Sequence, residues 1–236
     1  MLDWLYPNTC EFCGELSDST ICPDCLGAME RVPRPICLYC GAPTYGLAAS
    51  GDRCRACRSF PRDYDFARAA LLRTPRAMDL VHAFKYGRAG HLCRALAPLL
   101  ADLWEHTPQL RSCRDWGLVP VPILRPRLFG RGYNQAEELA ASLARLRGLR
   151  MLQPLCRVDT GQISQTRLSA QERQRNARRA YQLTPRWREG KEAPPPNLLL
   201  IDDVYTTGAT ARACAARLRT LPGVKQIGVL TLVRAG

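Results

Sequence analysis

Long apolar runs and targeting signals are absent from this chain of 236 residues. None of its apolar stretches approaches the roughly 18 residues that a membrane-spanning helix needs. The first ten residues, MLDWLYPNTC, lack the basic region and the apolar stretch of a secretory signal. We therefore expect a cytoplasmic protein, bacterial in type, without a membrane span.

Lysine is also scarce, so arginine supplies most of the positive charge. The lysines are Lys85, Lys191 and Lys225. Residues 1–60 hold five arginines against seven acidic residues, whereas residues 61–236 hold 29 lysines and arginines against 14 acidic residues. The formal net charge of +13 therefore belongs to the larger, C-terminal part. Such a surplus is typical of a protein with a polyanionic ligand or partner, although a coding bias toward arginine produces it equally well.

Cysteine, by contrast, is abundant, and eight of the twelve cysteines form C-x-x-C pairs within the first 57 residues. The pairs are Cys10 with Cys13, Cys22 with Cys25, Cys37 with Cys40, and Cys54 with Cys57. Two residues between cysteines let both thiolates face one ion from a tight turn, so four pairs predict two tetrahedral four-cysteine zinc sites. Disulfides are the alternative, which a cytoplasmic location disfavours.

The order in which the four pairs combine is open at this point. Consecutive pairs can share an ion, and an interleaved arrangement is equally compatible with the spacing. In either case residues 1–60 hold little apolar material, so the metals supply much of the folding energy. We expect a small zinc-stabilised domain over residues 1–60 and a larger domain over residues 61–236. Sites with four cysteine ligands are closed, and their role is structural.

The larger part alternates between strand and helix patterns. Strands are expected over residues 66–72, 116–122, 198–204 and 224–233. Helices are expected over residues 74–87, 91–106, 134–147 and 209–220, with Asn134 as the N-cap of the third. Because strands that are apolar on both faces alternate with helices, the pattern predicts an α/β fold with a parallel sheet.

Two stretches interrupt this alternation. Residues 157–180 are rich in arginine, and SAQE at 169–172 offers a capping box for a short helix. Residues 185–197, PRWREGKEAPPPN, are expected to form a surface loop before the strand at 198–204.

The stretch LLLIDDVYTTGAT, residues 198–210, holds the strongest candidate site. Asp202 and Asp203 follow an apolar strand, and ligands of open α/β sheets bind beyond the carboxyl ends of the strands. The next residues provide backbone amides, hydroxyls and a helix N-terminus, which together suit a phosphate group. These residues are Thr206, Thr207, Gly208, Ala209 and Thr210. Paired acids suit the hydroxyls of a ribose, so we expect a ribose 5-phosphate rather than a bare anion.

A second candidate segment follows the strand that ends near Val121. It contains Arg125, Arg127 and Arg131, whose guanidinium groups match the oxygens of a pyrophosphate. A solvated basic turn is the alternative interpretation. Lys85, in the sequence FKYG, is a further candidate cation.

The segment at 198–210 resembles the motif by which type I phosphoribosyltransferases bind phosphoribosyl pyrophosphate (PRPP). Nearly the whole chain resembles the ComF-like family, which includes competence and GntX-like proteins. The resemblance is carried by the four C-x-x-C turns and by HAFKYG, RGYNQAEELA, QTRLSAQERQRNARRAY and LLLIDDVYTTGAT, in that order. It implies a double zinc ribbon followed by a type I phosphoribosyltransferase fold.

The resemblance also implies roles for the candidate residues. Asp202 and Asp203 would be catalytic, orienting the ribose hydroxyls and stabilising the positive charge that develops at C1. The residues from Thr206 to Thr210 would bind the 5-phosphate, and Lys85 with the three arginines would bind pyrophosphate. Mg²⁺ would accompany PRPP, held mainly by oxygens of PRPP itself. Residues 157–180 would cover the site and exclude water.

The alternative is a non-catalytic protein that binds PRPP and handles single-stranded DNA, with competence-machinery proteins as possible partners. The positive charge of residues 61–236 and the arginines of 157–180 favour it through phosphate contacts. Aromatic residues make up only 7% of the chain and are not interleaved with those arginines, which disfavours a stacking mode of DNA binding.

Overall fold

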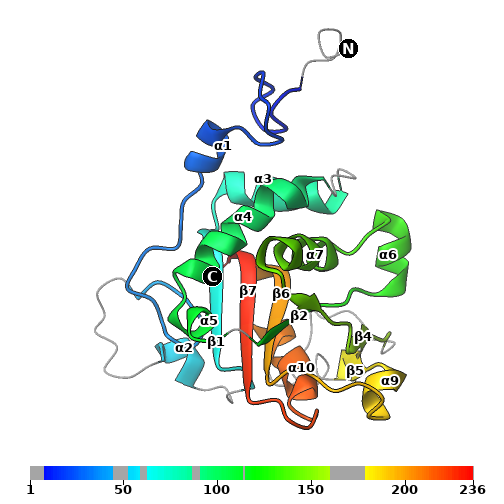
Figure 1. Ribbon diagram of the computed structural model, residues 1–236. Helices are drawn as coiled ribbons and strands as arrows, with labels where there is room; N and C mark the ends of the chain where they lie inside the picture. Colours follow the sequence, from blue (N-terminus) through cyan, green and yellow to red (C-terminus); the bar gives the residue numbers. More distant parts are fainter. Residues whose placement is uncertain are drawn as a thin grey trace, which may run out of the picture.

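The computed structural model describes residues 8–44, 53–58, 63–86, 91–113, 115–159 and 179–235. Its centre is a parallel five-stranded sheet with the order β1-β7-β6-β2-β3 (Figure 1). The strands are β1 (Phe66–Leu72), β2 (Trp116–Pro120), β3 (Arg150–Met151), β6 (Asn197–Tyr205) and β7 (Gln226–Arg234). The predicted parallel α/β fold is confirmed, and β6, which carries the acidic pair of the candidate site, lies inside the sheet.

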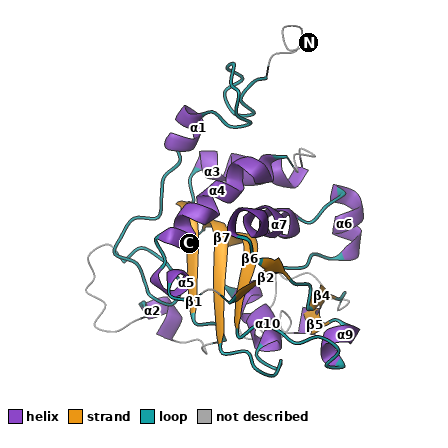
Figure 2. Ribbon diagram, in the orientation of Figure 1, coloured by secondary structure: helices purple, strands orange, loops and turns teal. Residues whose placement is uncertain are grey.

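Helices cover both faces of the sheet (Figure 2). One face carries α3 (Pro75–Tyr86), α4 (Leu92–Glu105) and α7 (Gln135–Arg147), and the other carries α10 (Ala209–Leu218). Side chains alternate between the faces, so the side chains of Leu199 and Ile201 join the α3/α4/α7 cluster while those of Leu198 and Leu200 join the α10 cluster. This two-sided burial explains why the strand reads as an uninterrupted apolar run.

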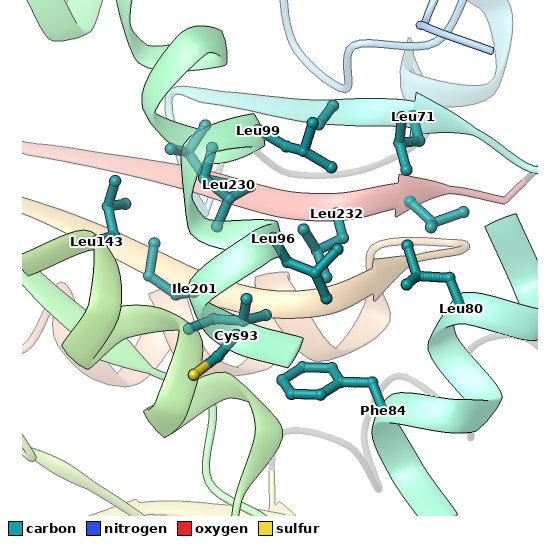
Figure 3. Close-up of a cluster of buried hydrophobic side chains, with 14 of the residues drawn as sticks. Leu71, Leu80, Phe84, Cys93, Leu96, Leu99, Leu143, Ile201, Leu230 and Leu232 are labelled. Atoms are coloured by element: carbon teal, nitrogen blue, oxygen red, sulfur yellow. The ribbon is translucent and has the colours of Figure 1, made fainter. Parts of the chain in front are cut away.

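The larger of the two clusters packs α3, α4 and α7 onto the sheet, as Figure 3 shows. Leu80 and Phe84 of α3 and Leu96 of α4 are fully buried against Ile201 and Leu230. Burying a side chain of this size stabilises the fold by about 1.5–3 kcal/mol. The cluster therefore holds the C-terminal end of α3, with Lys85, in a fixed place beside the sheet.

Local signals account for several of the observed boundaries. The Asn134 side chain accepts a hydrogen bond from the Ala136 amide and caps α7 as predicted. The prediction of a surface loop at 185–197 holds for residues 189–196 but was wrong for Pro185–Arg188, which form the short helix α9 with Trp187 buried. Among the described residues, none of the helices has the length and apolar character of a membrane-spanning segment.

A second, two-stranded sheet pairs β4 (Leu155–Arg157) with β5 (Tyr181–Leu183) in antiparallel fashion. These strands flank the arginine-rich stretch predicted as a cover. Residues 160–178, which include the expected capping box, lie outside the described residues.

The cysteine-rich N-terminal part packs along the free edge of β1. It includes the short helices α1 (Pro23–Gly27) and α2 (Arg55–Arg58). The Leu72 amide donates to the Glu30 carbonyl at 2.8 Å, and the Ala67 amide donates to the Tyr39 carbonyl at 2.6 Å. At Gly41 a Cβ would lie 2.6 Å from the Ala67 carbonyl oxygen, so only glycine permits this approach. Residues 30–44 therefore cover the outer edge of the sheet.

Candidate functional site

The candidate site forms where β6 ends and α10 begins. Gly208 has φ +73° and provides the left-handed turn into α10. A Cβ at Gly208 would lie 2.2 Å from the Tyr205 hydroxyl oxygen, so both conformation and space require glycine. A hollow of about 50 Å³ is lined by Asp202 and by residues 206–210, which we call the TTGAT loop. The structure thus brings together the acidic residue, the hydroxyls and the helix N-terminus that the sequence singled out.

The two acids have different environments, which the sequence does not show. Asp203 is buried, with 9% of the residue exposed. Its carboxylate lies 2.7 Å from the Lys85 ammonium. The Asp202 carboxylate instead lines the hollow and accepts a hydrogen bond from the Asp203 amide at 2.9 Å. Burial, and next the charge of Asp203, raise the pKa of Asp202 well above its ordinary value. Asp203 is therefore the ion-paired acid, and Asp202 is the one that faces the space for a ligand.

The back of the TTGAT loop is held by two arginines. Arg234, at the end of β7, donates to the Thr206 carbonyl at 2.7 Å, and Arg212, in α10, donates to the Thr207 carbonyl at 3.0 Å. Both arginines are buried, with exposed fractions of 7% and 3%. Because the carbonyls are occupied on the inner side, the amides at the start of α10 are left to face a ligand, which suits an anion.

Two tyrosines support the same loop at Gly208, because Tyr205 packs against it and Tyr64 is hydrogen-bonded to Tyr205. The Tyr205 hydroxyl lies 2.5 Å from that of Tyr64, and the Tyr64 ring stacks on Tyr39 with centroids 4.4 Å apart. Burial raises the pKa of both Tyr64 and Tyr205, so they remain protonated and hydrogen-bonded. Neither these tyrosines nor the two arginines are among the residues predicted from the sequence. The available signal was the presence of Arg212 and Arg234 within otherwise apolar segments.

The predicted basic segment after β2 forms the helix α6 (Arg125–Arg131). Arg125 and Arg127 are exposed on it. Arg131 contacts the ring and hydroxyl of Tyr86, at the end of α3 next to Lys85. Of the four predicted pyrophosphate ligands, Lys85 contacts the acidic pair directly, and Arg131 contacts Tyr86, the neighbour of Lys85 in the chain.

The eight paired cysteines form two clusters, each with its sulfur atoms within 4.8 Å of one another. The first four-cysteine site contains Cys10, Cys13, Cys22 and Cys25, and the second contains Cys37, Cys40, Cys54 and Cys57. Consecutive pairs therefore share a site, which settles the order that spacing leaves open. These four-sulfur clusters match the tetrahedral ligand set of zinc.

Hydrogen bonds favour the thiolate form of Cys37 in the second site, whereas the hydrogen bond with Cys37 raises the pKa of Cys40 and burial raises the pKa of Cys57. The Cys37 sulfur accepts from the backbone amides of Cys40 at 3.5 Å and Cys54 at 3.2 Å. The hydrogen bond with the Cys40 thiol has the largest effect, and together with these amides it lowers the pKa of Cys37 to about 4, against the opposing effect of burial. The two sites thus fit Zn²⁺, and their four sulfurs close each of them to substrate.

A second hollow lies between the cysteine-rich part and the end of α4. Its volume is about 230 Å³. Its charged lining consists of Arg31, Arg34, Arg68, Asp102 and His106. Three arginines face a single carboxylate, so this basic hollow has a positive potential.

The fold and the sites define an α/β protein with a candidate anion site at the end of β6 and a double zinc ribbon at its N-terminus. The family model described as "Double zinc ribbon domain" matches residues 1–58.

Known proteins are similar to this chain over most of its length. It is 30% identical to Competence protein F of Haemophilus influenzae, covering 89% of this chain and 90% of the relative. It is 32% identical to DNA utilization protein YhgH of Salmonella typhimurium, covering 97% of each. It is 26% identical to Competence protein ComFC of Bacillus subtilis, covering 92% of this chain and 85% of the relative. The chain belongs to the ComF-like family of competence proteins.

Proposed function

We propose that the protein binds Mg-PRPP at the end of β6 and transfers its phosphoribosyl group to an acceptor. The observation that carries this proposal is the junction of Asp202 and the TTGAT loop around one hollow. Amides and hydroxyls of the loop suit the 5-phosphate, and the adjacent carboxylates suit the ribose hydroxyls.

The environments of the acids support different roles in this reaction. Ribose hydroxyls that donate to Asp202 favour its charged form and offset the effect of burial. Lys85 balances the charge of Asp203, and because one quarter of the Lys85 side chain is exposed, its ammonium can also contact pyrophosphate. Arg125, Arg127 and Arg131 are further proposed contacts of the pyrophosphate.

In the proposed step the bond from C1 to pyrophosphate breaks and its electron pair leaves with pyrophosphate. The acceptor then donates a pair to C1 and loses a proton. Asp202 and Asp203 stabilise the positive charge at C1 between these events. Mg²⁺, bound mainly through oxygens of PRPP, would neutralise charge on the leaving group.

The test is Mg²⁺-dependent release of pyrophosphate from PRPP by the full, zinc-loaded chain, with purine bases, pyrimidine bases and single-stranded DNA as acceptors. We expect one acceptor class to stimulate release. The double variant Asp202→Asn with Asp203→Asn is expected to lose at least about 100-fold in rate. PRPP affinity is measured in parallel by calorimetry.

The control is Glu137→Gln with Glu138→Gln, which makes the same charge change at another adjacent acidic pair, in the first turn of α7. It should retain full release. Unchanged PRPP affinity in the aspartate double variant would contradict the site assignment.

A second candidate function, a non-catalytic PRPP-binding protein that handles single-stranded DNA, is favoured by the basic hollow. Arg31 and Arg34 line it, and about half of the Arg31 side chain is exposed. A groove with surplus arginine suits the backbone of a nucleic acid. The names of the YhgH relatives as DNA utilization proteins agree with this candidate.

For this candidate we expect Arg31→Glu with Arg34→Glu to weaken binding of a fluorescent oligonucleotide and to reduce the slope of log affinity against log salt by about 1–2 units. Arg186→Glu with Lys191→Glu is the matched control, because these surface cations form ion pairs outside the hollow. Equal salt slopes for both variants would contradict the proposal that the basic hollow binds single-stranded DNA.

A further inference from the structure

Arg234 touches two parts of the molecule that the proposed function treats separately. Its Nη1 donates to the Thr206 carbonyl in the TTGAT loop at 2.7 Å. Its Nη2 lies 3.7 Å from the Cys40 sulfur, within hydrogen-bond range of a thiolate. One guanidinium fork therefore connects a ligand atom of the second four-cysteine site to the backbone of the candidate phosphate loop.

The position of Arg234 is fixed independently of these two contacts. It is the last residue of β7, where it pairs in register with Tyr205 of β6. Its guanidinium lies 4.4 Å from the centroid of the Tyr205 ring. Within the described part of the chain, no carboxylate forms an ion pair with Arg234. Its buried charge is therefore matched by backbone carbonyls, by the Tyr205 ring and by the Cys40 sulfur.

The charge of a loaded zinc site explains this pairing. Four thiolates around one Zn²⁺ carry a net charge of about −2, which needs nearby donors when buried. Arg68 lies on the same side, donating to the Leu38 carbonyl between the cysteines of the Cys37–Cys40 turn at 3.0 Å. The second four-cysteine site thus faces two buried arginines, one from each of the adjacent strands β1 and β7.

A second route joins the same two places. Tyr39, between Cys37 and Cys40, stacks on Tyr64, and Tyr64 shares a short hydrogen bond with Tyr205 beneath Gly208. The first four-cysteine site has a different environment. Its Cys10 and Cys22 belong to the apolar cluster of α3 and α4, on the other face of the sheet from the Tyr64–Tyr205 pair.

We propose that Arg234 is a positioning residue through which zinc in the second four-cysteine site and a ligand at the TTGAT loop stabilise each other. The ligand class, a ribose 5-phosphate such as PRPP, rests on the proposed function. With zinc bound, the thiolate charge orients Arg234, and Arg234 holds the Thr206 carbonyl inward so that the loop amides face the phosphate. By linkage, a bound ligand must then strengthen zinc retention by the same factor.

The test uses the full zinc-loaded chain and two site-resolved measurements. Alkylation of cysteines in the presence of a zinc-selective chelator and excess Mg²⁺, read by peptide mass spectrometry, gives separate zinc-loss rates for the two sites. Amide hydrogen exchange gives the opening of residues 205–210 without any ligand. Calorimetry gives the affinity for Mg-PRPP.

In the wild type, Mg-PRPP is expected to slow alkylation of the second site at least about threefold and to leave the first site unchanged. Arg234→Gln is expected to lose this protection, to weaken PRPP binding about tenfold, and to speed exchange of residues 205–210. Arg234→Lys keeps the positive charge but lacks the forked guanidinium group. Its values should fall between those of the wild type and those of Arg234→Gln. Each variant should still bind two zinc ions.

The matched control is Arg147→Gln. Arg147 also lies over an aromatic ring, that of Trp104, and donates to a backbone carbonyl, that of Ala101 at 3.2 Å. The Arg147→Gln variant should leave both the affinity for Mg-PRPP and the amide exchange of residues 205–210 unchanged.

Two failures are distinguishable. If the wild type binds PRPP but ligand does not protect the second site and Arg234→Gln binds normally, the coupling through Arg234 is wrong and the proposed function stands. If the wild type does not bind PRPP, the proposed function fails, and hydrogen exchange alone decides on Arg234. Unaltered exchange of residues 205–210 in Arg234→Gln would overturn the positioning role.

Discussion

Replacing Gly208 with alanine is expected to abolish measurable PRPP binding and to destabilise the protein by about 3 kcal/mol, through left-handed backbone strain and overpacking together. The φ angle of +73° disfavours any L side chain, and the new Cβ would meet the Tyr205 hydroxyl oxygen at 2.2 Å and its Cζ at 2.7 Å. Tyr205 cannot move aside freely, because its hydroxyl is hydrogen-bonded to the hydroxyl of Tyr64. Thermal melting should show a decrease of about 5–10 °C.

Gly223→Ala separates the two causes of this effect. Gly223 has φ +83°, but a Cβ added there would have no atom within 4 Å, so its substitution introduces backbone strain alone. We expect it to lower the melting temperature less than half as much and to leave PRPP affinity unchanged. Equal effects of the two substitutions would mean that the contact with Tyr205 does not restrict the loop.

Asp202→Asn is expected to move stability and binding in opposite directions. Burial raises the pKa of Asp202 above its ordinary value of 3.8, so the folded state holds this proton more tightly than the unfolded state. Ionising the buried carboxyl therefore costs stability as pH rises above about 4. Asparagine avoids this cost, and the variant should be more stable than the wild type by about 1–2 kcal/mol at neutral pH.

The pH profile is the decisive measurement. The gain in melting temperature for Asp202→Asn should shrink as the pH falls and disappear below about pH 3, where wild-type Asp202 is protonated in both the folded and the unfolded state. PRPP affinity of the variant should fall more than about tenfold, because the amide cannot supply a carboxylate to the ribose hydroxyls.

Asp203→Asn is the paired comparison. It removes the partner of Lys85, 2.7 Å away, and should destabilise the protein by about 1–2 kcal/mol. If Asp202→Asn were instead less stable than the wild type at every pH, the hydrogen bond from the Asp203 amide would outweigh the effect of burial.

The sequence is most informative where local chemistry decides the structure. The apolar run of β6, the glycine before α10 and the Asn134 cap each depend on neighbours in the chain, so their patterns predict the observed elements. The C-x-x-C spacing likewise predicts two zinc sites but not which pairs share a site, because that depends on how distant turns meet.

Most of the features that the sequence did not predict depend on contacts between distant segments. The ion pair of Lys85 with Asp203 joins α3 to β6, and the contact of Arg234 with Cys40 joins β7 to the zinc ribbon. No periodicity in the sequence connects such residues. The α6 helix is a local feature, and Pro126 in its first turn is the sequence signal that favours a helix start there.

The cover of residues 30–44 along β1 has a consequence for the newly made chain. An open parallel sheet has two border strands whose unpaired amides and carbonyls can recruit a strand from another molecule. One border here is β3, which is only two residues long. The other, β1, is seven residues long, and its outer amides at Ala67 and Leu72 are occupied by Tyr39 and Glu30. We therefore expect a chain that lacks zinc in this segment to expose a long, apolar border strand and to aggregate more readily than the zinc-loaded chain.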